Sequence, residues 1–231
     1  MSLPVLLAIE TSQRVGGVAL RDREGTIHVE VLNESKRHDD DLMPAIDRMF
    51  SKAGLTPRDL EAVAISIGPG GFTGLRIAIT TAKMFAQTLG VKLLAIPSAE
   101  VVAQSMEDEA GPILITLAGK GDNAWITHLV RTNGLWEILG EPGLMDAGQL
   151  DLEAITILVA DQYLPAAMRK KAQQVGVPIH EPKFDPQACL LVGSRFLQAG
   201  LVTEPGNLNP LYPRPPEAVS IWEQRKAKSD A

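Results

Sequence analysis

The sequence predicts an α/β protein whose sheet ends in parallel strands. Three short apolar runs, at residues 5–10, 62–67 and 91–96, have the length and composition of buried strands. The last two runs are separated by a glycine-rich loop and a long stretch with helical periodicity. Because a strand, a helix and a second strand in succession normally form a parallel pair, we expect these two strands to be parallel neighbours.

The first hundred residues alternate between strands and helices. The expected strands are residues 5–10, 16–21, 26–32, 62–67 and 91–96. The expected helices are residues 39–53, 73–89 and 98–108. Short turns join the first three strands, so the sheet should begin antiparallel. Gly54 and Gly90 end the first two helices, and Ser98 is the expected N-cap of the third.

The second half begins after an acidic, Gly-Pro-containing stretch and repeats the strand-then-helix order. The expected strands are residues 113–117, 123–130, 135–139 and 155–160. The expected helices are residues 165–175 and 186–199. Asn133-Gly134 is a typical hairpin turn, and the proline-rich tail from Glu204 onward should run extended over a surface. We therefore expect two parts, an N-terminal one at 1–104 and a divergent C-terminal one at 105–231.

Composition favours a soluble, cytoplasmic protein. The net charge of −6 argues against a broad, sequence-independent grip on nucleic acid, which needs a basic face. The single Cys189 excludes a framework of internal disulfides and fits a reducing compartment. No apolar run approaches the roughly 18 residues that span a membrane, so we expect no membrane contact.

The loop at residues 68–76, Gly-Pro-Gly-Gly-Phe-Thr-Gly-Leu-Arg, is the most distinctive stretch of the chain. A glycine-rich turn that opens a helix can cradle a phosphate, because the first amides of a helix are unpaired. The loop has no lysine before its threonine and lacks the dinucleotide-binding glycine spacing, so a purely structural turn is the favoured alternative. The candidate nucleotide or phosphate residues are Glu10, Thr11, Ser12, Gly68, Gly70, Gly71 and Thr73.

Other catalytic signatures are missing from the sequence. The histidines at positions 28, 38, 128 and 180 are scattered, and one cysteine cannot complete a zinc site, so we expect no metal. No Gly-x-Ser-x-Gly element marks a hydrolase nucleophile. The sequence therefore offers no catalytic residues and no cofactor that this chain would bind by itself.

The two long helices of the first half carry more apolar surface than one face needs. Met43, Ile77 and Met84 lie beside the main apolar stripes. Those stripes either pack on the chain's own sheet or pair with another protein. The candidate interface residues are Leu42, Ile46, Met49, Phe50, Leu75, Ala78, Ile79, Ala82, Phe85 and Ala86.

Several motifs together resemble the bacterial TsaB (YeaZ) family. They are residues 6–12, residues 18–20, His38 with residues 42–44, and residues 68–76 with Ala82-Lys83. The resemblance is strong over residues 5–100 and weak in the second half, where a Pro-x-Tyr-x-Arg element resumes it at residues 210–214.

The resemblance implies an actin/Hsp70/sugar-kinase-like fold with two related subdomains. It also implies a non-catalytic subunit that pairs, through its two N-terminal helices, with a TsaD-like catalytic subunit. With a TsaE-like ATPase, such a complex transfers threonylcarbamoyl to adenosine 37 of tRNA, and the ATP is used by the complex. The exposed pairing face further implies a possible homodimer of the free chain.

The sequence departs from the family in two places. Glu10 stands where aspartate is usual, and residues 116–122 replace a more typical Asp-Ala-Arg element. Two enzymatic alternatives stay open: a small-molecule kinase or ATPase of the same superfamily, which would use Glu10 and the glycine loop, and a glycoprotease-like peptidase. ATP turnover by the isolated chain, lost in Glu10→Ala, would distinguish the kinase.

Overall fold

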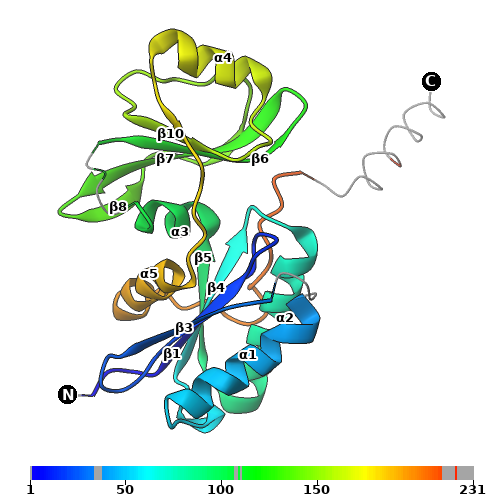
Figure 1. The fold of residues 1–231 in the computed structure, drawn as a ribbon, viewed down its shortest axis with the longest axis vertical. Coiled ribbons are helices and arrows are strands. Elements are labelled where there is room, and N and C mark those ends of the chain that lie inside the picture. Colours follow the sequence, from blue (N-terminus) through cyan, green and yellow to red (C-terminus); the bar gives the residue numbers. More distant parts are fainter. Residues whose placement is uncertain (1, 34–37, 107–108, 110, 215–221, 223–231) are drawn as a thin grey trace.

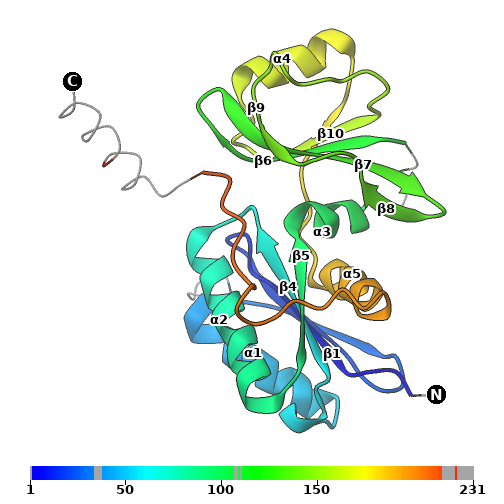
Figure 2. The ribbon, with the colours of Figure 1, turned by 180° about the vertical axis from the view of Figure 1, so that it is seen from behind.

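The computed structural model describes residues 2–33, 38–106, 109, 111–214 and 222. Two β-sheets are stacked along the long axis of the molecule, with helices between them and on both outer sides (Figures 1 and 2). We call the part built on each sheet a subdomain. The layers follow the order α1 and α2, first sheet, α5 and α3, second sheet, α4.

The first sheet has the strand order β3-β2-β1-β4-β5. Its strands are β1 (Leu6–Glu10), β2 (Gly17–Arg21), β3 (Ile27–Val31), β4 (Ala62–Gly68) and β5 (Lys92–Pro97). β1, β2 and β3 pair antiparallel, whereas β4 is parallel to β1 and β5 is parallel to β4. The predicted antiparallel start and parallel end of the sheet are therefore confirmed.

The strand β1 is apolar on both faces because helices cover both sides of it. Leu7 and Ile9 belong to the core beneath α1 (His38–Lys52) and α2 (Phe72–Leu89). The alternate residues, Leu6 and Ala8, face the core beneath α5 (Pro186–Gln198). A strand buried on both faces has no polar alternation, which explains its continuous apolar sequence.

The second sheet has the order β11-β10-β6-β7-β8, with β9 paired to β7. Its strands are β6 (Ile113–Lys120), β7 (Asn123–Thr132), β8 (Leu135–Ile138), β9 (Gly143–Met145), β10 (Ile157–Ala160) and β11 (Ile179–His180). β6, β7 and β8 pair antiparallel, and β10 and β11 continue the sheet in parallel. This repeats the plan of the first sheet, so the prediction of two related subdomains in an α/β fold is confirmed.

The remaining helices differ from the predictions in detail. They are η1 (Pro57–Asp59), α3 (Ser98–Gln104) and α4 (Ala166–Val175). α3 ends earlier than the predicted residue 108, and residues 107–108 lie outside the described part of the chain. Ser98 is not the N-cap: Pro97 holds that position, and the Ser98 hydroxyl is 2.8 Å from that of Ser66 inside the protein.

The tail is anchored more firmly than the sequence predicted. The amide of Thr203 donates to the carbonyl of Leu93 at 2.8 Å, and Leu208 is fully buried beneath α1 and α2. From there the chain rises beside α2 toward the second subdomain, as both ribbon views show (Figures 1 and 2). The segment therefore belongs to the folded core up to Leu208 and continues over the surface beyond it.

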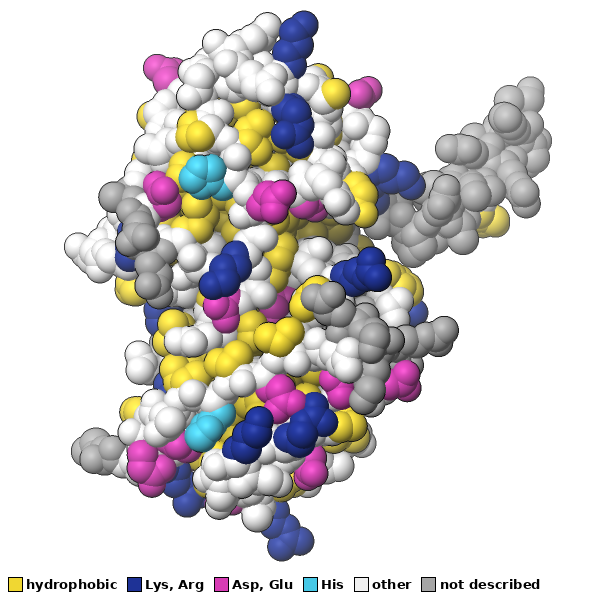
Figure 3. Space-filling model, viewed as in Figure 1, with side chains coloured by type: hydrophobic (Ala, Val, Ile, Leu, Met, Phe, Trp, Pro, Cys, Tyr) yellow, Lys and Arg dark blue, Asp and Glu magenta, His cyan; other side chains and the backbone are white. Residues whose placement is uncertain are grey.

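The surface mixes charges of both signs. On the face in Figure 3, lysine and arginine side chains alternate with aspartate and glutamate rather than forming one basic field. Within the described residues, no helix combines the length and the apolar character needed to cross a membrane.

Candidate partner-binding surface

The helices α1 and α2 lie side by side on one face of the first sheet (Figure 1). α2 begins after Gly71, and Gly90 ends it in the left-handed conformation, with φ of 70°. A glycine adopts that conformation without the steric cost of a side chain, so the predicted C-terminus is explained. α1 packs on β2 and β3, and α2 packs on β4 and β5.

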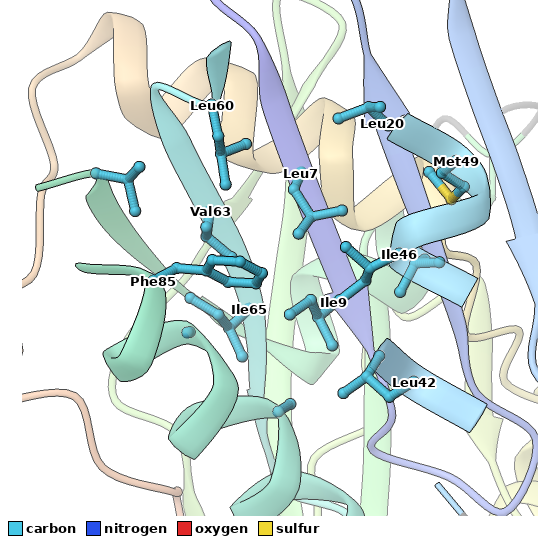
Figure 4. Packing of buried hydrophobic residues seen from close by; sticks show 14 of the residues in the cluster. Leu7, Ile9, Leu20, Leu42, Ile46, Met49, Leu60, Val63, Ile65 and Phe85 are labelled. Atoms are coloured by element: carbon cyan, nitrogen blue, oxygen red, sulfur yellow. The ribbon is translucent and has the colours of Figure 1, made fainter. Parts of the chain in front are cut away.

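The apolar stripes that the sequence assigns to partner contact pack instead against the chain's own sheet. Leu42, Ile46 and Phe85 point toward the strands, where they meet Leu7 and Ile9 (Figure 4). Nine of the ten candidates are buried: Leu42, Ile46, Met49, Phe50, Leu75, Ala78, Ile79, Ala82 and Phe85. Ala86 is partly buried and packs on the same core. Each helix therefore turns its more apolar stripe to the sheet, and a role of these ten residues in contacting a partner stays a prediction.

The second apolar side of the two helices stays on the surface. Met43 on α1 is 42% exposed, and on α2 Phe72 is 49% and Met84 43% exposed. A groove of about 350 Å³ runs between the helices. It is lined by Leu42, Met43, Arg76, Ile77, Thr80 and Thr81. Exposed apolar side chains around a shallow groove are typical of protein-binding surfaces. We call this side the outer face of α1 and α2.

The tail supplies an aromatic border to this outer face. The ring of Tyr212 stacks on that of Phe72, with centroids 5.3 Å apart and planes inclined by 23°. On the same Phe72 ring, the Arg76 guanidinium lies 4.4 Å from the centroid. A second groove, of about 680 Å³, separates α2 from the tail and is lined in part by Lys83, Asn209 and Tyr212. The outer face thus joins apolar, aromatic and cationic groups.

The glycine loop is held by the end of β1 rather than open to a ligand. The Gly71 amide donates to the Ser12 carbonyl at 2.6 Å, and the Thr11 hydroxyl donates to the Gly74 carbonyl at 2.9 Å. A side chain on Gly70 would overlap the Ser12 carbonyl. This close approach explains why glycine is needed there. The Gly71 amide is therefore already paired within the chain, which favours the structural turn.

Glu10 is fully buried, and its environment favours the neutral acid. Burial raises the pKa of its carboxyl, against the opposing effects of Ser12 and Ser66. Oε1 accepts a hydrogen bond from the Ser12 amide at 2.8 Å, whereas the buried Oε2 has no hydrogen-bond partner among the described residues. Thr73, in contrast, is exposed on the first turn of α2. The candidate phosphate residues are thus neighbours, but the carboxyl does not reach the surface.

The chain is similar in sequence to several known proteins. A model of the TsaD family, described as tRNA N6-adenosine threonylcarbamoyltransferase, matches residues 30–141. The tRNA threonylcarbamoyladenosine biosynthesis protein TsaB of Bacillus subtilis is 36% identical over 149 residues. The TsaB protein of Buchnera aphidicola is 31% identical over 135 residues. Over these segments the chain is similar to proteins of the TsaB (YeaZ) family.

The matched segments cover only part of these TsaB relatives. In the Bacillus comparison they span 64% of this chain and 65% of the relative, and in the Buchnera comparison 57% and 64%. The fold likeness is more extensive. YeaZ from Pseudomonas aeruginosa has a TM-score of 0.74 and 22% identity, over 91% of this chain and 100% of that one. The TsaB-like fold therefore extends over the second half, where sequence similarity is weak.

The sequence does not reveal the residues that border the outer face. Phe72 lies in the glycine loop of the sequence and Tyr212 in its tail, and no sequence pattern predicts a contact between residues 140 positions apart. A signal was present for Met43 and Met84, which stood outside the main stripes. The stronger stripe belongs to the core, so the residues outside it mark the free side.

Proposed function

We propose that this chain is the scaffold subunit of a tRNA threonylcarbamoyladenosine-forming complex. In this proposal it is itself non-catalytic and pairs with a TsaD-like catalytic subunit. A TsaE-like ATPase and the tRNA join through that complex, and ATP is consumed there. The names of the Bacillus and Buchnera relatives, both tRNA threonylcarbamoyladenosine biosynthesis proteins, support the process.

The outer face of α1 and α2 is the observation that carries the pairing proposal. Its apolar groove lies on two helices already fixed to the sheet by their inner stripes, so a partner meets a preformed surface. Met43 is 42% exposed, so a partner that covers the rest of it contributes about 1 kcal/mol, a fraction of the value for a fully exposed side chain. A two-helix surface of this kind fits a second pair of helices, from the TsaD-like subunit or, in the free chain, from a second copy.

The non-catalytic part of the proposal is supported by the state of Glu10. A kinase or ATPase of this superfamily would need a carboxylate near the phosphates, whereas Glu10 is buried and Gly71 is bonded to Ser12. No observation favours the peptidase alternative, although one structural relative from Pseudomonas aeruginosa is described as similar to peptidase YEAZ. ATP hydrolysis by the purified chain, lost in Glu10→Ala, would contradict the non-catalytic assignment.

The experiment that tests the pairing is co-expression of this chain with the TsaD-like subunit of the same genome, followed by size exclusion and light scattering. We expect one particle with the summed mass of the two subunits. The chain alone, run at several concentrations, reports whether the same face forms a homodimer. Separate elution of the two proteins, with and without ATP, would contradict the proposal.

A further inference from the structure

Residues 203–214 form a strap that is fixed to the first subdomain at three points. The Thr203 amide bonds to Leu93 at the edge strand β5, and Leu208 is buried in the core beneath α2. Further along, the Leu211 amide donates to the carbonyl of Ile67, at the end of β4, at 2.8 Å. The strap therefore moves with the first sheet as far as Leu211.

Arg214, three residues later, is bonded to the second subdomain. Its Nη1 donates to the carbonyl of Ala118 at 2.6 Å, and its Nη2 donates to the carbonyl of Asn123 at 2.8 Å. Both acceptors belong to the hairpin that joins β6 to β7. A guanidinium presents its donors in a rigid, planar fork, so two fixed carbonyls hold it in one orientation.

The hairpin is irregular where Arg214 binds. The pairing register between β6 and β7 shifts between Leu117 and Lys120, and Ala118 has a positive φ of 53°. Such a shift interrupts the ladder, so the Ala118 carbonyl is free to accept from outside the sheet. Because Ala118 is not glycine, its left-handed backbone conformation costs free energy, and the hydrogen bond from Arg214 helps to offset that cost.

The strap also contacts the outer face of α1 and α2. Between Leu211 and Arg214, the Tyr212 ring stacks on Phe72, the first residue of α2. Three residues of extended chain span roughly 10 Å, so little slack separates the bond to β4 from the bonds to the hairpin. A change in the angle between the sheets must therefore break the Arg214 bonds or pull on the start of α2.

We propose that Arg214 is a positioning residue that fixes the angle between the two subdomains and thereby the presentation of α2 to a partner protein. The fixing of the angle concerns this chain alone. The effect on a partner rests on the proposed function. Lysine carries the same charge but not the planar fork, so it should not replace Arg214.

The angle can be measured as a distance between spin labels in the free, full-length chain. Exposed residues suited to labelling are Ser51 on α1 and Gln174 on α4, each changed to cysteine. The native Cys189 is buried, so it should not react in the folded protein. We expect a narrow distance distribution with Arg214 present and a broad or shifted one in Arg214→Ala and Arg214→Lys.

Arg23→Ala is the matched control, because Arg23 is an exposed arginine that pairs with Asp59 inside the first subdomain. It should leave the distance unchanged, and circular dichroism should show all variants folded. Tyr212→Ala, which removes the stack and keeps Arg214, should leave the narrow distribution in place. A distribution for Arg214→Ala indistinguishable from that of the parent would overturn the proposal.

A binding measurement with the TsaD-like subunit distinguishes a failure of the Arg214 proposal from a failure of the proposed function. We expect Arg214→Ala to bind the TsaD-like subunit at least fivefold more weakly, and Met43→Asp to weaken binding without altering the label distance. Unchanged binding by Arg214→Ala would overturn the link to α2. If the parent chain does not bind that subunit, the proposed function fails, while the distance measurement still decides the role of Arg214.

Discussion

The methyl group of Ala64 on β4 lies against the backbone of Gly193 on α5, so closely that a side chain on Gly193 would overlap it. The two residues are 129 positions apart and come from different halves of the chain. Their contact brings α5, which follows the second sheet in sequence, onto the first sheet. The chain therefore completes the core of the first subdomain only after it has built the second sheet.

Gly193→Val should destabilise the protein through this contact. Forcing extra methyl groups into a packed core costs about 1–3 kcal/mol. For a chain of this size that lowers Tm by about 2–12 °C. Gly206→Val is the control, because no atom of the part of the chain that the structure describes lies within 4 Å of the position where its side chain would start. Equal Tm values for the two variants, measured by calorimetry, would show that α5 does not pack this tightly.

Two neighbouring glycines in the loop before α2 should respond differently to alanine. A side chain on Gly70 overlaps the Ser12 carbonyl, whereas one on Gly71 meets the same oxygen at an ordinary distance of 3.6 Å. We expect Gly70→Ala to lose about 1–3 kcal/mol of stability, because backbone must move. Gly71→Ala should lose less than about 1 kcal/mol, as expected for a helix N-cap. Chemical denaturation of both variants measures the difference.

Glu100 on α3 should make the protein less stable as pH rises. Burial raises its pKa to about 7, against the attraction of Arg195 on α5. The unfolded chain loses this proton near pH 4.5, so stability falls between about pH 4.5 and 7, by at most about 3 kcal/mol. Glu100→Gln should therefore stabilise the protein at pH 8 and change little at pH 4. Equal effects of the substitution at both pH values, in thermal melts, would contradict the raised pKa.

Ala82→Arg should unfold the monomer rather than selectively abolish pairing. Ala82 is fully buried in the core, so the substitution inserts both volume and charge, at a cost of several kcal/mol. Its neighbour Thr81 lines the groove on the outer face. Thr81→Arg should keep the Tm of the parent to within about 3 °C and weaken pairing. A folded Ala82→Arg protein would contradict the assignment of the inner and outer faces.

Most of the regular structure followed from local sequence. The long helices and apolar strands were predicted to within a few residues, because periodicity, glycine and proline fix them locally. β9 and β11 were missed, since three and two residues are too short to show a period. Both halves build a sheet with the same order of antiparallel and parallel strands, but the sequence shows only that strands and helices alternate.

The candidate site was predicted less well, for a physical reason. Amphipathic periodicity finds the most apolar stripe of a helix, and in α1 and α2 that stripe packs on the first sheet. The free side is marked by weaker features, such as Met43 and Phe72, whose exposure depends on which face the sheet covers. Contacts such as Phe72 with Tyr212 depend on the whole path of the tail, which has no regular period to follow.

One titration tests directly whether the outer face of α1 and α2 binds a TsaD-like subunit, as we propose. The purified subunit would be titrated calorimetrically with the parent chain, with Met43→Asp and with Leu135→Asp. Met43 and Leu135 are similarly exposed, at 42% and 48%, and lie on different subdomains. We expect Met43→Asp to bind at least tenfold more weakly, about 1.4 kcal/mol, and Leu135→Asp to bind as the parent does. Parent-like affinity of Met43→Asp would show that the subunit does not bind through this face.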